Sequence, residues 1–253
     1  MGWCVWGGLA AAQAAPYVIL QNDRRMDGVE IRAKADGTVV LISAGGQQME
    51  FTRGQYKQAV ADRPPEMEQA QRAMQAQQYD AAIPLLRKVM DNLRFLGWDE
   101  KAGELLVDAL AAKEDYKGAL DVYEQMIRQR PDVLKDANFG WGYRRALLGA
   151  GQAARLEPML KQLIESGSRE DAARAQLMRG DIRAAQGQLE AAALDYLRTA
   201  YFFEAEKAVR PEALLKVAAT LEKMRDARAK EWYQRLKMEF PGSPEAAAAA
   251  GKG

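Results

Sequence analysis

Histidine is missing from this sequence of 253 residues, and cysteine occurs once, at Cys4. Serine is scarce, with only Ser43, Ser166, Ser168 and Ser243. Structural zinc sites, haem ligation by histidine, and Ser-His-Asp or Cys-His catalysis all need side chains that this chain lacks. We therefore expect no metal and no cofactor. Carboxylates, Lys, Tyr and Arg are what remain for catalysis.

An excess of charge of either sign is also missing. Lys and Arg total 36, and Asp and Glu total 35. A nucleic-acid-binding surface usually brings a strong basic excess, so we expect no nucleic-acid partner. With 48% hydrophobic and 28% charged residues, the chain has enough apolar side chains for a sizeable core.

The first 14 residues contain no charged side chain and are rich in Ala and Gly. They end in Ala12-Gln13-Ala14, a small-x-small pattern, so we predict a signal peptide at residues 1–14 with a cut after Ala14. A membrane span needs about 20 apolar residues, more than this segment has. No Lys or Arg precedes the apolar run, so an apolar N-terminal helix and a mis-set start codon are the alternatives. Cleavage would leave a chain without Cys, which suits an oxidising compartment.

Residues 15–62 have the alternating and β-branched pattern of strands. Short strands are predicted at residues 17–20, 29–34, 38–42 and 49–52, with turns at Asp36-Gly37 and Ala44-Gly45-Gly46. Two or three strands of this length bury too little surface to be stable alone. We expect a small antiparallel meander that packs on the first helix and caps the helices. A free edge that accepts a strand from a partner is the alternative.

Beyond Arg63-Pro64-Pro65 the apolar residues recur at spacings of three and four, which is typical of amphipathic helices. This helical part repeats. Five anchor residues are separated by 37, 37, 36 and 37 residues, and a large residue follows each anchor by four positions. Two closely packed helices require such an alternation of small and large side chains. The anchors are Ala82, Ala119, Leu156, Ala192 and Ala229, and the large residues are Leu86, Tyr123, Leu160, Tyr196 and Tyr233. The third repeat departs from the pattern, because its anchor Leu156 is itself large.

These positions resemble the second helix of a tetratricopeptide (TPR) repeat, with a short turn, a small Ala, a Tyr or Leu four residues on, and a closing Pro. Pro131 and Pro241 stand at the closing position, and Gly180 stands where the first helix often carries Gly or Ala. The period is slightly longer than the family's 34 residues. The resemblance implies a mainly α fold, a TPR-like α-solenoid of about five helix pairs at residues 63–245. A flexible tail is expected at residues 246–253.

The ending Phe240-Pro241-Gly242-Ser243-Pro244 is similar to repeats of bacterial envelope proteins in the outer-membrane assembly and Tol-Pal accessory groups. The resemblance implies an exported, non-enzymatic scaffold in the periplasm or cell envelope of a Gram-negative-type bacterium, which binds a protein or peptide in its groove. A self-associating structural subunit, hence a homo-oligomer, and an accessory factor in outer-membrane or cell-wall assembly are the alternatives.

In TPR arrays the first helices of successive pairs line a concave groove. Carried over to this chain, the groove face consists of Met67, Gln71, Met74, Lys101, Glu104, Asp108, Trp141, Arg145, Leu177, Asp181, Leu214 and Leu221. Residues 139–145 combine aromatic rings with arginines, a mixture common at binding hot spots. The predicted partner-binding residues are Lys101, Glu104, Asp108, Trp141, Tyr143, Arg144, Arg145 and Asp181. Alternatively, Trp141 and Tyr143 belong to the core between repeats and the arginines are solvated.

The carboxylate clamp of some TPR proteins needs Lys and Asn in consecutive first helices. Met67, Gln71, Glu104 and Asp108 stand there instead, which argues against a co-chaperone role.

Paired acids are the catalytic arrangement left to consider, at Asp99-Glu100, Glu170-Asp171, and Glu204 with Glu206. Their spacing selects no pair for glycoside hydrolysis, and Asp99, Glu170 and Asp171 suit helix starts, where negative charge is favoured. We interpret Tyr201-Phe202-Phe203 as the buried end of a helix.

Overall fold

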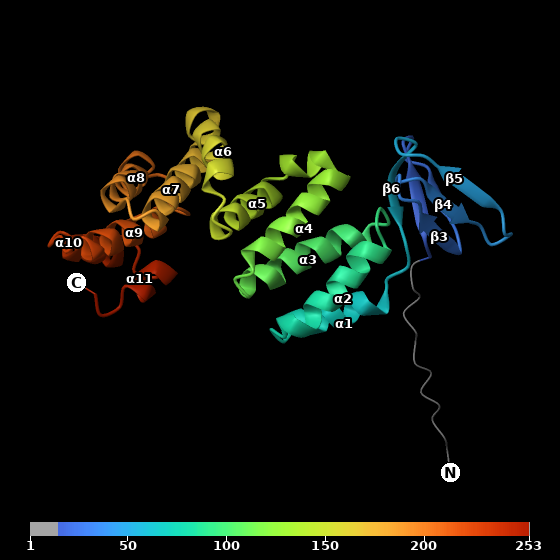
Figure 1. Ribbon diagram of the computed structural model, residues 1–253, viewed down its shortest axis with the longest axis horizontal. Coiled ribbons are helices and arrows are strands. Elements are labelled where there is room, and N and C mark those ends of the chain that lie inside the picture. The colour runs from blue at the N-terminus through green and yellow to red at the C-terminus, as the bar shows by residue number, and fades with distance from the viewer. Residues whose placement is uncertain (1–14, 253) are drawn as a thin grey trace, which may run out of the picture. The chain divides into compact units, whose positions relative to one another are not determined.

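The computed structural model describes residues 15–252 of the chain (Figure 1). Within these residues it contains six β-strands, eleven α-helices and one 3-10 helix. The predicted signal peptide at residues 1–14, with Cys4, lies outside the described residues. The described chain forms two compact units, one up to Ala146 and the other from Leu147 onward. None of the described helices is long and apolar enough to cross a membrane.

The N-terminal β part consists of two antiparallel three-stranded sheets, in the orders β2-β1-β6 and β3-β4-β5. The strands are β1 (Tyr17–Leu20), β2 (Arg25–Asp27), β3 (Glu30–Ala33), β4 (Val39–Ile42), β5 (Gln48–Phe51) and β6 (Tyr56–Val60). The predicted small antiparallel region is confirmed, but it has six strands, of which β1, β3, β4 and β5 correspond to the four predicted ranges. Sequence patterning missed β2, which has three residues, and β6, whose exposed positions are polar.

Helices follow one another from residue 65 to residue 248, as the apolar spacing predicted. They are α1 (Pro65–Gln75), α2 (Tyr79–Asn92), α3 (Trp98–Ala112), α4 (Tyr116–Gln129), the 3-10 helix η1 (Pro131–Lys135), α5 (Ala137–Gly149), α6 (Ala153–Ser166), α7 (Arg169–Ala185), α8 (Leu189–Phe202), α9 (Arg210–Lys223), α10 (Ala229–Glu239) and α11 (Pro244–Ala248). In the chain, α1 to α10 form five successive pairs, which agrees with the predicted number. Second helices also pack on the next first helix, as α2 does on α3 and α8 does on α9.

The two sheets share one apolar cluster, which contains Val18, Val39, Leu41, Ala59, Ala61 and Leu96. Leu93 and Trp98, at the connection between α2 and α3, pack against this cluster. The β part therefore packs on the connection between α2 and α3, and not on the first helix as predicted. The indole Nε1 of Trp98 donates to the carbonyl of Ala61 at 2.8 Å, and the guanidinium of Arg53 donates to the carbonyl of Gln129 at the end of α4.

The repeat positions predicted from the sequence are core positions. The five anchors and the five large residues that follow them are at most 8% exposed. The residues a further three positions on, Val89, Met126, Thr199 and Leu236, are buried as well. Leu163 at the fifth such place is only half-buried. The spacing in the sequence thus reports directly which side of each second helix faces its neighbours.

The same repeat appears in the backbone at the turn within each pair. The second residue after each first helix has a left-handed φ, at Gln77 (56°), Glu114 (59°), Gly151 (70°), Gly187 (76°) and Arg225 (57°). The N–H of the next residue donates to the carbonyl five residues earlier, as from Asp115 to Leu110 at 2.9 Å. This is a Schellman cap, which satisfies carbonyls at a helix end. It recurs at all five turns.

Close helix approach depends on glycine at one place in α7. A Cβ on Gly180 would lie 2.4 Å from Cε1 of Tyr196 on α8. Normal carbon–carbon contacts are about 3.5–4.0 Å, so only glycine fits against this ring without a shift. The small residue on the first helix and the large residue on the second are therefore one packing unit.

Two prolines lie inside second helices. α2 begins at Tyr79 and α6 at Ala153, so Pro84 and Pro158 are each the sixth residue of their helix, beyond the first turn, where proline is best tolerated. Both prolines are exposed, so water can reach the carbonyl that loses its N–H partner. Packing of the apolar side holds these helices together across the missing bond.

Two further segments, the chain after residue 245 and the end of α8, also differ from expectation. Residues 246–253 were predicted to be flexible, but Ser243 caps α11 by accepting the N–H of Ala246 at 3.0 Å, and Ala249 is fully buried. The end of α8 was predicted to be buried, but Tyr201 and Phe202 are 55% and 69% exposed. Of that aromatic triplet, Phe203 packs against the core.

Candidate functional site

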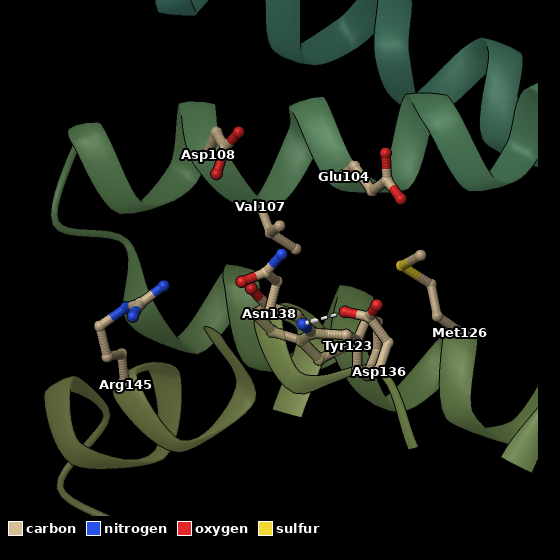
Figure 2. Close-up of a pocket in the computed structure, with 9 residues that line it drawn as sticks. Glu104, Val107, Asp108, Tyr123, Met126, Asp136, Asn138 and Arg145 are labelled. Atoms are coloured by element: carbon tan, nitrogen blue, oxygen red, sulfur yellow. Dashed lines mark hydrogen bonds between the residues drawn. The ribbon is translucent and has the colours of Figure 1, made fainter. Parts of the chain in front are cut away.

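A polar cleft of about 410 Å³ lies in the unit that ends at Ala146 (Figure 2). Glu104 and Asp108 stand one turn apart on α3, and Arg145 reaches toward the cleft from α5. The lining residues are Glu104, Val107, Asp108, Tyr123, Met126, Asp136, Asn138, Phe139 and Arg145. Because α3 and α5 are the first helices of consecutive pairs, the cleft lies where the TPR resemblance predicted a groove.

The charged groups of the cleft are not neutralised by contact with one another. Among the described residues, Glu104, Asp108 and Arg145 form no ion pair. Burial raises the pKa of Asp108, and the guanidinium of Arg145 opposes that rise. Burial likewise raises the pKa of the Tyr123 hydroxyl. The charge of Arg145 lowers this pKa, and the carboxylates of Asp108 and Glu104 raise it further. These charges influence each other across the cleft, yet their hydrogen-bonding capacity stays open to a ligand.

Aromatic rings form one wall of the cleft. The rings of Tyr123 and Phe139 meet edge to face, with centroids 4.9 Å apart and an angle of 84°. The ring centroid of Tyr143 lies 6.0 Å from that of Tyr123. A carboxylate oxygen of Asp136 accepts the N–H of Phe139 at 2.8 Å, the dashed line in Figure 2, and this contact fixes the start of α5. The rings are therefore held in place before any ligand arrives.

At the equivalent place in the unit from Leu147 onward, the carboxylate is bonded by neighbouring side chains. Tyr196 follows its anchor by four residues, as Tyr123 does, and its hydroxyl donates to Asp181 at 2.8 Å. Lys216 donates to the same carboxylate at 2.7 Å and pairs with Glu212 at 2.7 Å. Burial raises the pKa of the Tyr196 hydroxyl, and the charge of Asp181 adds to the rise. The carboxylate that corresponds to Asp108 is thus already neutralised here.

Three of the predicted partner-binding residues line the cleft: Glu104, Asp108 and Arg145. The predicted aromatic platform is contradicted, because Trp141 and Tyr143 are 5% and 9% exposed and so belong to the core. This is the alternative that the sequence left open.

The other predicted residues lie elsewhere. Arg144 stacks on the buried Trp141 with its guanidinium carbon 5.0 Å from the ring centroid. Lys101 is exposed near Trp98, and its Nζ is 5.9 Å from that ring. Asp181 belongs to the closed network of the other unit. The groove positions Met67, Leu177, Leu214 and Leu221 are buried, because an apolar side chain on a first helix faces its packing partners.

Phe139 belongs to the favoured segment 139–145 but was not among the predicted partner-binding residues. Sequence reasoning missed the other cleft residues, which are Val107, Tyr123, Met126, Asp136 and Asn138. Tyr123 was recognised as a repeat position and assigned to the core alone. An Asp three residues before Phe139, at the start of a helix, is a capping signal that would have placed the beginning of α5 and its first ring.

The acidic pair Asp99-Glu100 is a candidate for acid–base chemistry, because burial raises the pKa of both carboxyl groups. The space beside them leaves no room for a water molecule. Asp99 accepts the N–H of Phe95 at 2.9 Å, and Glu100 forms an ion pair with Arg130. Asp99 is buried and Glu100 is held by Arg130, so these acids order the start of α3.

The remaining acidic pairs are also structural. Ser168 caps α7 by accepting the N–H of Asp171 at 3.1 Å. Glu170, Glu204 and Glu206 each pair with an arginine. In residues 15–252, no group of three or more acidic or sulfur side chains is arranged to hold a metal ion.

Solved structures show what the fold is similar to. A structure titled MamA 41-end, from Desulfovibrio magneticus RS-1, matches with a TM-score of 0.50 and 18% identity, covering 71% of this chain and 94% of that chain. The chain has a TPR-like fold. A MamA RS-1 double mutant covers 69% of this TPR-like chain and 91% of its own, with a TM-score of 0.48 and 18% identity.

A third structure is YrrB, described as a TPR protein with an unusual peptide-binding site. It has a TM-score of 0.43 and 17% identity to the TPR-like chain, covering 73% of it and 90% of YrrB. Neither a protein-family model nor a curated protein sequence matches the chain.

Proposed function

We propose that this protein is a non-enzymatic scaffold that binds a peptide or protein segment in the cleft between α3 and α5. The supporting observation is the contrast between two equivalent places. In one unit, Asp181 is neutralised by Lys216 at 2.7 Å, whereas Asp108 in the other unit has no ion-pair partner among the described residues. An ionised group kept beside aromatic rings without a partner is a group available for recognition.

The chemistry of the cleft defines the ligand. Glu104, Asp108 and Asp136 contribute three carboxylates, and Arg145 contributes the single cation of the lining. A complementary segment therefore carries a Lys or Arg side chain for the carboxylates and an acceptor, such as a carboxylate or backbone carbonyl, for Arg145. An apolar residue of the segment would rest against Phe139.

The proposal extends to the compartment. The small-x-small ending of residues 1–14 supports export to a bacterial envelope, where the scaffold would hold an envelope protein. A purely self-associating subunit is the alternative. An assembly accessory for the outer membrane or cell wall would use the same cleft.

Crosslinking capture from a native envelope fraction tests the proposal with three forms of the protein. Wild type is compared with Arg145→Glu, which reverses the only cation of the cleft. The matched control is Arg128→Glu, an equal reversal on α4 at a side chain that is 69% exposed and does not line the cleft.

We expect wild type and Arg128→Glu to capture the same specific protein, and Arg145→Glu to lose it while its helical circular dichroism is unchanged. Equal capture by all three forms would refute the cleft as the binding site. A mass that rises with concentration and no captured partner would favour the self-associating subunit.

A further inference from the structure

A second surface, on the unit from Leu147 onward, exposes apolar side chains that a helical repeat would normally bury. Leu194 and Tyr201 on α8 are 53% and 55% exposed. They are seven residues apart, so they share one side of the helix with Leu197 between them. Trp232 on α10 adds a partly buried ring. We name the surface formed by Leu194, Leu197, Arg198, Tyr201, Arg228, Trp232 and Arg235 the α8–α10 face.

This face contains a cleft of about 440 Å³, lined by Leu197, Tyr201, Leu221, Arg228, Glu231, Trp232 and Arg235. The rings of Tyr201 and Trp232 meet edge to face at 5.6 Å. The guanidinium of Arg235 lies over both rings, 5.3 Å from one centroid and 5.4 Å from the other. An aromatic pair held by an arginine is a preformed apolar anchor site with a small entropic cost of binding.

The charge that this face presents to solvent is mainly positive. Arg228 is 70% exposed, whereas its partner Asp226 is 22% exposed. Arg198 is 49% exposed, whereas its partner Asp195 is fully buried. Arg235 and its partner Glu239 are equally exposed, and Glu231 is the exposed acid on the cleft lining. Each of the first two pairs is neutral in sum but turns its cation outward.

We propose that the α8–α10 face binds an acidic amphipathic segment of another protein. An aromatic or aliphatic side chain of that segment enters the cleft beside Tyr201 and Trp232, and its carboxylates contact Arg198 and Arg228. Trp, Tyr and Arg are the residues that most often dominate binding energy at protein interfaces. An amphipathic helix in an apolar groove is a common form of such recognition. This site is independent of the α3–α5 cleft, whose lining is mostly acidic.

A labelled synthetic peptide of about 16 residues is a suitable probe, with Leu and Trp at helical spacing on one side and Glu on the other. Its counterpart has Lys in place of every Glu. Fluorescence anisotropy is measured with the full chain at two salt concentrations. We expect the Glu peptide to bind saturably, more weakly at high salt, and the Lys peptide to bind at least about tenfold more weakly, since opposite charge is what selects the partner.

Variants assign the binding to the face. Arg228→Glu should weaken the Glu peptide about tenfold, and Tyr201→Gln should weaken it by removing the exposed ring. Lys230→Glu is the matched control, because Lys230 is exposed on α10 but does not line the cleft. Arg145→Glu should bind the Glu peptide like wild type, which separates this site from the proposed function.

Equal binding of both peptides, or equal effects of Arg228→Glu and Lys230→Glu, would overturn the proposal. So would a concentration-dependent mass that Tyr201→Gln abolishes in the absence of peptide binding, since the face would then be an interface between copies of the chain.

Discussion

The contact between Gly180 and Tyr196 provides the most direct test of how the helix pairs pack. Replacing Gly180 by Ala adds one Cβ that would lie 2.4, 2.7 and 3.0 Å from three atoms of the Tyr196 ring. The ring cannot simply rotate away, because its hydroxyl donates to Asp181 at 2.8 Å. To restore a normal contact the helices or the ring must shift by roughly 1 Å.

Two opposing effects set the magnitude. Overpacking of a dense core typically costs about 1–3 kcal/mol, whereas Ala in place of Gly inside a helix gains about 0.5–1 kcal/mol. We expect Gly180→Ala to lower the free energy of unfolding by about 1–2 kcal/mol. Urea denaturation followed by circular dichroism measures this change, with Gly140→Ala as the control. At Gly140 the nearest atom is the flexible end of Arg144 at 3.0 Å, so that variant should be unchanged or slightly more stable.

A double variant separates the clash from other effects. In the background of Tyr196→Leu, which removes the ring, Gly180→Ala should no longer destabilise the protein, giving a coupling energy of at least about 1 kcal/mol. If Gly180→Ala is as stable as wild type, the ring is not rigidly held and the packing argument fails.

Three further predictions concern single side chains. Burial raises the pKa of Asp99, so the native state binds its proton at a higher pH than the unfolded chain; the advantage of wild type over Asp99→Asn should therefore grow as urea unfolding is moved from about pH 7 to about pH 4, and a constant difference would contradict this. Asp195→Ala removes the buried partner of three arginines, one of them Arg183 at 2.6 Å, and should lower the free energy of unfolding by roughly 2–4 kcal/mol in the same assay; a change below about 1 kcal/mol would show that the arginines find water without cost. Glu114→Gly relieves a left-handed φ of 59° and should raise thermal stability by about 0.5–1 kcal/mol, whereas Gly187→Ala, at 76°, should lower it by a similar amount, and equal signs would refute the turn argument.

The fold could be predicted to the extent that it follows from local spacing. Anchors such as Ala82 and large residues such as Leu86 are buried because each second helix must fit against its neighbours. The same residue types therefore recur at nearly constant spacing in the sequence. β6 could not be recognised, because its pairing with β1 is non-local and Lys57 and Gln58 mask its pattern. The left-handed backbone conformation of non-glycine residues such as Gln77 could not be predicted either, since glycine is the residue type that indicates this conformation in a sequence.

The candidate site was predictable by its charges and not by its rings. Glu104, Asp108 and Arg145 lie on first helices, and helix positions carry over from the family geometry. The prediction that Trp141 is an exposed binding residue was wrong, because the exposure of this side chain depends on how closely the neighbouring helices approach. A Cβ at the adjacent Gly142 would lie 2.1 Å from the hydroxyl of Tyr123, which shows how tightly α4 and α5 meet. That distance is a tertiary property that no spacing rule reports.

The attachment of the β part has a mechanical consequence. In an array whose pairs contact only their neighbours, the curvature of the array follows from a small rotation between each pair and the next. Here one β body is fastened through Trp98 to the connection between the first two pairs and through Arg53 to the far end of the second. These two attachments restrain the first junction, so a change in the angle between the first two pairs would have to break one of them.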